Sequence, residues 1–179
     1  MKTIGEMDMG ELAAFVCSHL KKNNINVVLS GGACVSIYAE GKYVSYDLDF
    51  IENLSSGRRK LKKVLAEISF EEEGRYFKHS ATQFFLEFPL GPLAVGEEPP
   101  QKVITLRFAT GELTVLSATD CVKDRLAAYF HWNDRECFEQ ALLVAKNNEI
   151  DLQEIERWSL KEGHEKKYQE FRDALLTGS

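Results

Sequence analysis

Hydrophobic and polar positions along the chain change between the helical and the strand period, which predicts an α+β protein. Near the N-terminus, Leu12, Val16 and Leu20 recur every four residues, the spacing that places apolar side chains on one face of a helix. Further along, apolar and acidic residues alternate over 46–51, the period of a strand with two different faces. The elements predicted for the first part of the chain are a helix at 9–22, a strand at 27–29, a short helix at 34–38, a strand at 46–51 and a helix at 55–67, capped by Ser55.

The pattern after these elements predicts several more strands and then a long helical tail. Short strands are expected around Phe70 and at 75–77, and the run 84–88 strongly favours a strand. Residues 89–101 are rich in proline and glycine and predict a loop, either a lid over a site or a crossover connection. The remaining predicted elements are a hairpin of strands at 102–108 and 112–116, and helices near 119–131, 135–147, 151–162 and 164–176.

Two structural parts follow from this order of elements. Residues 1–117 are expected to form a mixed β-sheet flanked by helices, and residues 118–179 a helical lobe packed on that core. A chain of 179 residues is long enough for one core domain with a small addition.

Composition and charge narrow the class of protein. Apolar residues make up 44% and charged residues 28%, an ordinary globular balance, and the net charge of −6 argues against nucleic-acid binding by bulk charge. A local basic run at 58–63 is either a solvated helix face or a contact for RNA or triphosphate. The four cysteines form no CxxC pair, and neither a signal peptide nor a membrane span is recognised, so we expect a cytoplasmic protein with reduced thiols.

The first candidate chemistry is the pair Asp47 and Asp49. Two acids separated by one residue on a strand point to the same face, where their carboxylates lie close enough to share a cation. A cation between them offsets the repulsion of two like charges, and Mg²⁺ prefers such oxygen ligands. Alone the pair is a weak signal, because an exposed strand face carries acids for solubility.

The upstream segment Ser30-Gly31-Gly32 strengthens the interpretation. It lies between a buried strand and a short helix, where glycine lets the backbone approach a ligand and a helix N-terminus offers free N–H groups to phosphate. The plain alternative is a tight strand-to-helix turn. The combined order of strand, Gly-Gly, helix and Asp-x-Asp is much more specific than either half.

With these motifs in view, the stretch VVLSGGACVSIYAEGKYVSYDLDF resembles the signature of the nucleotidyltransferase superfamily. Ser45 matches a small hydroxyl residue often found just before the Asp-x-Asp pair, although the gap from Gly32 to Asp47 is slightly long. The resemblance also implies a third carboxylate on a neighbouring strand, and Glu87 in Phe85-Leu86-Glu87-Phe88 fits that pattern. Glu112 is a weaker alternative, and an outward-facing residue is the plain reading of Glu87.

The C-terminal part is similar to the minimal nucleotidyltransferase and abortive-infection toxin branch of that superfamily. The counterparts of its two helical elements are Asp124-Arg125-Leu126 and Asn133-Asp134-Arg135-Glu136. Arg125 stands where lysine is usual and Gln140 stands where a second acid is common, which departs from the branch. The planar fork of Arg125 could still contact phosphate.

The resemblance implies a metal-dependent nucleotidyltransferase that transfers a nucleoside monophosphate from a nucleoside triphosphate such as ATP to a hydroxyl of a protein, an RNA or a small molecule. Asp47, Asp49 and Glu87 would hold two Mg²⁺ (or Mn²⁺) ions ~3.5–4 Å apart and perform catalysis, with Glu87 helping to deprotonate the acceptor. The residues expected to bind the nucleotide are Ser30, Gly31, Gly32, Ser45 and Arg125.

Within this leading hypothesis, the chain is expected to be the toxin or antitoxin member of a two-gene phage-defence module with a cognate partner. A second hypothesis is a catalytically inactive protein of the same fold that binds a partner protein or RNA. A weaker third hypothesis is a metal-dependent hydrolase that uses the same carboxylates. Activity depends on the site and not on the fold alone.

Overall fold

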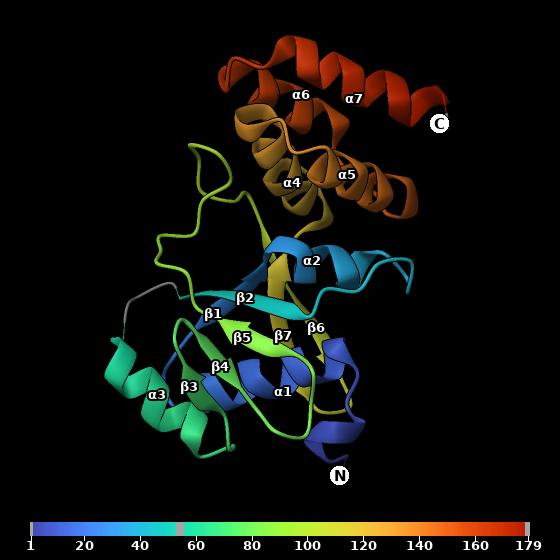
Figure 1. The fold of residues 1–179 in the computed structure, drawn as a ribbon. Helices are drawn as coiled ribbons and strands as arrows, with labels where there is room; N and C mark the ends of the chain where they lie inside the picture. Colours follow the sequence, from blue (N-terminus) through green and yellow to red (C-terminus); the bar gives the residue numbers. More distant parts are fainter. Residues whose placement is uncertain (1, 53–55, 178–179) are drawn as a thin grey trace.

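Helices lie on both faces of one mixed sheet in the computed structural model, which describes residues 2–52 and 56–177 (Figure 1). The predicted α+β class is therefore confirmed. The sheet has seven strands in the order β3-β4-β5-β2-β1-β7-β6. The strands are β1 (Val27–Ser30), β2 (Asp47–Glu52), β3 (Glu71–Glu73), β4 (Tyr76–Lys78), β5 (Phe85–Glu87), β6 (Val103–Phe108) and β7 (Gly111–Leu116).

The centre of the sheet is built by strands that are distant in sequence. β1 is antiparallel to β2 and parallel to β7, and β2 is parallel to β5. β3, β4 and β5 are antiparallel neighbours, and β6 and β7 form the predicted hairpin at the opposite edge. All four residues of β1 are buried, as expected for a short, mostly apolar run in the middle of a sheet.

One face of the sheet is covered by α1 (Met9–Lys22), which follows the short 3₁₀ turn η1 (Ile4–Glu6). The Asp8 side chain accepts a hydrogen bond from the Glu11 backbone, so a capping box starts the helix. Leu12, Val16 and Leu20 are buried, and the helix packs on β7, β6 and β1. Its bounds match the prediction, because the apolar pattern extends over several helical turns and the helix has a clear N-terminal cap.

Helix α3 (Arg58–Ala66) packs beside β3 at the other end of the sheet. Gly57 is its N-cap residue, whereas the predicted cap, Ser55, lies outside the described residues. The strand expected around Phe70 is instead β3, directly after it, because Phe70 is buried as the chain leaves the helix.

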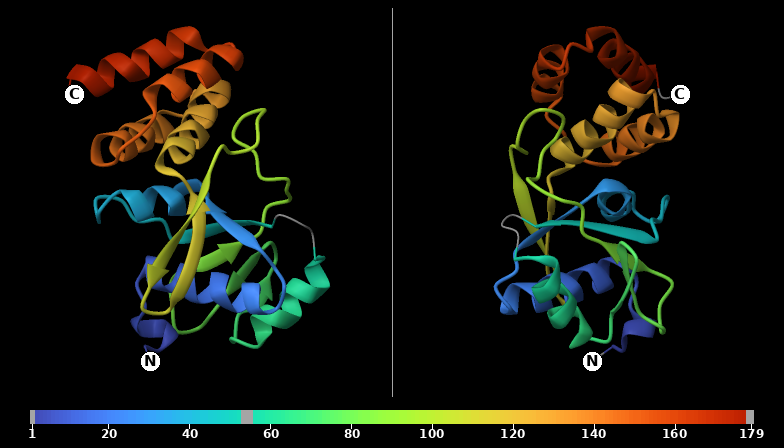
Figure 2. Two further views of the ribbon diagram at one scale, coloured as in Figure 1. Left: turned by 180° about the vertical axis from the view of Figure 1, so that it is seen from behind. Right: turned by 60° about the vertical axis from the view of Figure 1, so that its left-hand side comes forward.

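On the opposite face lie α2 (Gly31–Tyr38) and four C-terminal helices that form a lobe above it (Figure 2). Helix α2 begins at Gly31 and not at Cys34, so both glycines belong to its first turn, which corrects the predicted start. The Tyr38 hydroxyl donates to the Leu116 carbonyl at 2.7 Å, and the Asn148 amide donates to the Tyr38 carbonyl at 3.0 Å, which ties α2 to the lobe. The lobe helices are α4 (Ala118–Trp132), α5 (Arg135–Asn147), α6 (Leu152–Lys161) and α7 (Glu165–Thr177).

The proline-rich segment 89–101 runs from β5 to β6 and is fastened to the lobe. Val95 is fully buried, and its carbonyl accepts a hydrogen bond from the Trp158 indole at 3.1 Å. These contacts favour the crossover connection over the lid. Helix α4 begins at Ala118, and a domain division at that point stays a prediction. In the described part of the chain, every helix is too short or too polar to cross a lipid bilayer.

Candidate metal and nucleotide site

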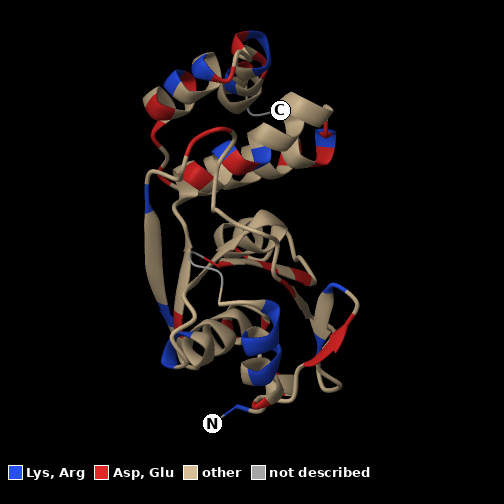
Figure 3. Ribbon diagram, turned by 90° about the vertical axis from the view of Figure 1, so that its left-hand side faces the viewer, with Lys and Arg blue, Asp and Glu red and all other residues tan. Residues whose placement is uncertain are grey.

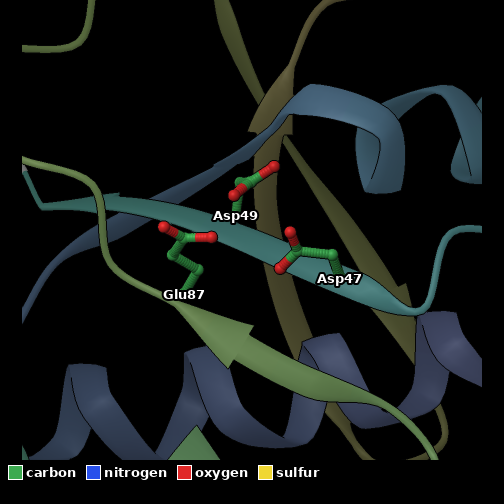
Figure 4. A group of neighbouring side chains, drawn as sticks. All are labelled: Asp47, Asp49 and Glu87. Atoms are coloured by element: carbon green, nitrogen blue, oxygen red, sulfur yellow. The ribbon is translucent and has the colours of Figure 1, made fainter. Parts of the chain in front are cut away.

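Three carboxylates from β2 and β5 converge on one face of the sheet (Figure 4). Asp47 and Asp49 alternate with buried Leu48 and Phe50 on β2, so both acids point to the same face. The parallel neighbour β5 pairs Glu87 with Asp49 in register. One oxygen of each carboxylate lies within 4.8 Å of the others, a spacing that a single cation can bridge.

The carboxylates repel one another in a partly buried space. Burial and the neighbouring Glu87 raise the pKa of Asp47 to about 6. Burial, Asp47 and Glu87 together raise the pKa of Asp49 to about 7. Within the described residues, the buried Oδ1 atom of Asp47 has no hydrogen-bond partner. A buried oxygen without a donor is unfavourable, so this geometry fits an external cation.

The predicted phosphate turn lies directly beside these acids. Ser30 pairs in register with Asp49, and its hydroxyl donates to the Asp49 carbonyl at 3.4 Å. Gly31 has a left-handed φ of +65°, and a Cβ placed there would overlap the Asp49 carboxylate. Only glycine therefore leaves room for the turn against Asp49. The N-terminus of α2 consequently opens beside the carboxylates, where its free N–H groups suit a phosphate.

Ser45 and Tyr43 support the same turn from the loop before β2. A Cβ at Gly32 would lie 3.1 Å from the Tyr43 hydroxyl and 3.2 Å from Ser45 Oγ. Ser45 also donates from its backbone to Ser36 Oγ at 2.7 Å and from its hydroxyl to the Asp47 carbonyl at 3.0 Å. The structure thus places Ser45 beside Gly32, and its hydroxyl is already used to hold the loop.

Arg125 approaches the site from the lobe. Its guanidinium contacts Asp124 at 2.6 Å, and it donates to Gln140 Oε1 at 3.5 Å. Gln140 in turn donates to the Tyr43 hydroxyl at 3.1 Å, so this cluster joins α4 and α5 to the loop behind the phosphate turn. The positive charge of Arg125 acts against the rise in the pKa of Asp49.

Arg75 was missed by reasoning from sequence. It lies in the turn between β3 and β4, and its Nε lies 3.4 Å from Glu87 Oε1. The pattern around it predicted only a strand, because the contact depends on the register of β4 with β5. The alternative third acid, Glu112, lies elsewhere on β7, paired with Lys21 and Arg107, so the structure brings Glu87 and not Glu112 to Asp47 and Asp49.

The donor set fits a divalent cation of the Mg²⁺ type. The three ligands are carboxylate oxygens, which hard cations prefer, and one of these oxygens is buried without a donor. The fold and the site together define an α+β protein whose sheet presents three carboxylates beside a glycine turn at a helix N-terminus.

Comparison with known proteins adds two structural likenesses. Neither a family model nor a curated protein matches the sequence. The solution structure of the antibiotic-resistance factor ANT(2'')-Ia is 12% identical with a TM-score of 0.49, and the alignment covers 95% of each chain. A crystal structure of ANT(2'')-Ia in complex with adenylyl-2''-tobramycin is 14% identical with a TM-score of 0.46, covering 90% of this chain and 93% of that one. Both TM-scores and both identities are too low to assign an activity to this chain.

Proposed function

We propose that this protein is a metal-dependent nucleotidyltransferase that transfers a nucleoside monophosphate from a nucleoside triphosphate to a hydroxyl acceptor. The observation that carries the proposal is the convergence of Asp47, Asp49 and Glu87 within 4.8 Å, beside the Gly31 turn. The resemblance of the Gly-Gly and Asp-x-Asp segment to the nucleotidyltransferase signature supports the same reaction class.

The three carboxylates would hold the divalent ion. Bound there, the ion would lower the pKa of the acceptor hydroxyl and neutralise the triphosphate. Its positive charge also explains why two acids with raised pKa values share this face.

The other residues bind and orient the substrate. The N–H groups of the first turn of α2, at Gly31 and Gly32, would receive the phosphates, and Arg125 would bring its guanidinium from the lobe. As the acceptor oxygen bonds to the α-phosphorus, the bond from that phosphorus to the leaving pyrophosphate breaks. Glu87 would take the proton of the acceptor hydroxyl.

A catalytically inactive protein of the same fold is the second candidate. Its support lies at Arg125, where lysine is usual in the branch that the sequence resembles. The guanidinium is already bonded to Asp124 and Gln140, which limits its freedom to meet a phosphate. A role as toxin or antitoxin in a phage-defence module, with a cognate partner, rests on the resemblance and stays a prediction.

Transfer of label separates the two candidates. We expect the protein to transfer label from an α-³²P-labelled triphosphate in the presence of Mg²⁺ or Mn²⁺, when each of the nucleotides is tested with a cell extract as source of acceptor. Asp47→Asn should abolish transfer, whereas Glu71→Gln, on the exposed edge strand β3, should leave it unchanged. Transfer that persists in Asp47→Asn would refute this site.

Stability provides an independent readout for the same variant. Without divalent ions Asp47→Asn should raise the unfolding temperature, because it removes a partly buried carboxylate that Glu87 repels. Burial and this repulsion raise the pKa of Asp47 to about 6. The gain should be about 1 kcal/mol after discounting for solvent exposure, or about 2–4 °C for a chain of this size. Added Mn²⁺ should stabilise the wild type more than the variant, as thermal scans with and without EDTA would show.

A further inference from the structure

One row of paired residues crosses four strands of the sheet at the site. Ser30 of β1 pairs with Asp49 of β2, Asp49 pairs with Glu87 of β5, and Glu87 pairs with Tyr76 of β4. Neighbouring strands lie about 4.8 Å apart, and paired side chains share one face. The row therefore runs from the Gly31 turn at one end, across the carboxylates, to an aromatic residue at the other end.

The direction of this row decides from which side an acceptor must come. In phosphoryl transfer, the attacking and leaving oxygens lie roughly in line on opposite sides of the phosphorus. If the Gly31 turn seats the triphosphate, as the proposed function requires, pyrophosphate leaves toward β1 and α2. The acceptor hydroxyl then approaches from the side of β4 and β5.

The side chains on that side are two neighbouring aromatic rings and one guanidinium group. Phe85 pairs in register with Asp47, and its ring meets the Tyr76 ring edge-on at 4.8 Å between centroids. The Arg75 guanidinium lies 4.8 Å from the centroid of the Tyr76 ring and donates to the Tyr76 hydroxyl at 2.5 Å. Phe85 and Tyr76 are partly exposed, and the Arg75 side chain is 69% exposed, so all three are accessible.

The turn that carries Arg75 is held in place by the basic helix α3. Arg58 donates to the carbonyls of Gly74 and Arg75 at 3.2 and 3.0 Å, and its guanidinium also bonds Glu72 at 2.7 Å. In Figure 3 the basic residues of α3 lie near the acidic strand β3. Glu72 is paired with Arg58 and Glu73 with Lys78, which offsets the acidic charge of this edge around Arg75.

We propose that Arg75, Tyr76 and Phe85 bind the acceptor, and that this acceptor is the 3′ end of a single-stranded RNA. An accessible aromatic ring suits stacking by an unstacked base, and an exposed guanidinium beside it suits the adjoining phosphate. The terminal ribose would then present its hydroxyl toward Glu87. Recognition by a few contacts at one end is compatible with a chain whose net charge is −6.

Binding of a short fluorescein-labelled oligoadenylate tests the inference without requiring transfer. Fluorescence anisotropy at increasing KCl, with Mg²⁺ present and no triphosphate, gives affinity and salt dependence for each variant. We expect Phe85→Ala to weaken binding about tenfold with an unchanged salt slope, because it removes stacking. Arg75→Ala should weaken binding and also reduce the salt slope by about 0.7, the value for one phosphate contact on a single strand.

Two controls make the outcome decisive. Arg107→Ala, on the edge strand β6 with a side chain 87% exposed, should bind like the wild type. Phe85→Leu keeps apolar volume and should fold, so weak binding by a stably folded Phe85→Leu protein would still report the loss of stacking. No binding by the wild type, or equal binding by all variants, would overturn the inference.

The result is distinguishable from failure of the proposed function. Label transfer that requires Asp47 but is insensitive to Arg75→Ala and Phe85→Ala would leave the transferase standing and reject the RNA acceptor. Binding that depends on Arg75 and Phe85, in a protein that transfers no label, would reject the transferase and retain an RNA-end binding surface.

Discussion

Gly31 is the residue of the site whose lack of a Cβ atom has the largest structural consequence. Its positive φ and its contact with Asp49 impose two separate requirements, one on the backbone and one on space. The carboxylate of Asp49 can lie beside the phosphate turn only because no Cβ occupies that space. At this scale the geometry depends on excluded volume at Gly31 and on the repulsion between neighbouring carboxylates.

Substituting Gly31 by alanine should damage the site beyond the cost of backbone strain. We expect Gly31→Ala to lose about 1–2 kcal/mol of unfolding free energy, because an L-residue is disfavoured at positive φ. Its Cβ should also displace the Asp49 carboxylate and weaken Mn²⁺ binding at least about tenfold, since one of three oxygen ligands is moved. Isothermal titration calorimetry and urea denaturation would measure the two effects.

Gly41 supplies the matched control for this substitution. Its φ is +81°, and a Cβ there would meet nothing within 4 Å. Gly41→Ala should therefore lose a similar amount of stability and retain Mn²⁺ affinity. Equal metal affinity in the two variants would contradict the proposed packing of Gly31 against Asp49.

At the scale of elements, the segment 89–101 and helix α6 act together. Glu98, which lies in the 89–101 segment, forms ion pairs with Arg157 at 2.7 Å and with Lys161 at 2.5 Å. Arg157 also bonds Glu154 at 2.7 Å, so one guanidinium joins two carboxylates from different elements. Such a network, with the Trp158 hydrogen bond to Val95, explains why a proline-rich stretch is held firmly on the lobe.

This network should make the protein sensitive to acid. Hydrogen bonds from Arg157 lower the pKa of both Glu98 and Glu154 to about 2, below the usual 4.5. Their stabilising effect is therefore complete above pH 4.5 and disappears as the pH falls toward about 2. Glu98→Gln should reduce this acid-dependent loss, as urea denaturation at pH 7 and pH 3 would show. The neighbouring variant Glu97→Gln should retain the wild-type profile.

At the scale of the whole molecule, the arrangement of the candidate site depends on how the lobe packs on the sheet. The junction between the sheet and the lobe contains a fully buried lysine, Lys123. Its Nζ donates hydrogen bonds to Asp120 at 3.1 Å and to Glu154 at 2.9 Å. Asp120 also accepts a hydrogen bond from the Lys102 backbone, where the chain enters β6. Arg125 lies two residues further along the same helix, α4.

Replacing Lys123 by methionine should destabilise the protein strongly. The change would leave the buried Asp120 without its cation and would leave Glu154 with Arg157 alone. Breaking such a buried group costs about 3–5 kcal/mol. Equilibrium urea unfolding would measure this loss, with Lys63→Met on the exposed side of α3 as the control. A loss below about 1 kcal/mol would show that the buried charges do not hold the junction.

Much of the site was predictable from local sequence. The alternation at 46–51 placed Asp47 and Asp49 on one face, because the side-chain period of a strand is local. The apolar run around Glu87 marked an acid that needed a partner, and the glycine pair marked a close backbone approach. The errors in the predicted elements were confined to their ends: α2 starts at Gly31, and the short strands β3 and β4 are displaced by one or two residues.

The sequence by itself determined the elements, the α+β class and the candidate acids, since periodicity, capping and turn chemistry act over a few residues. Only the tertiary structure decided that Glu87 and not Glu112 completes the carboxylate group, and that Arg75 contacts Glu87. These contacts depend on strand order and register. Such relations join residues far apart in the chain, and no local pattern encodes them.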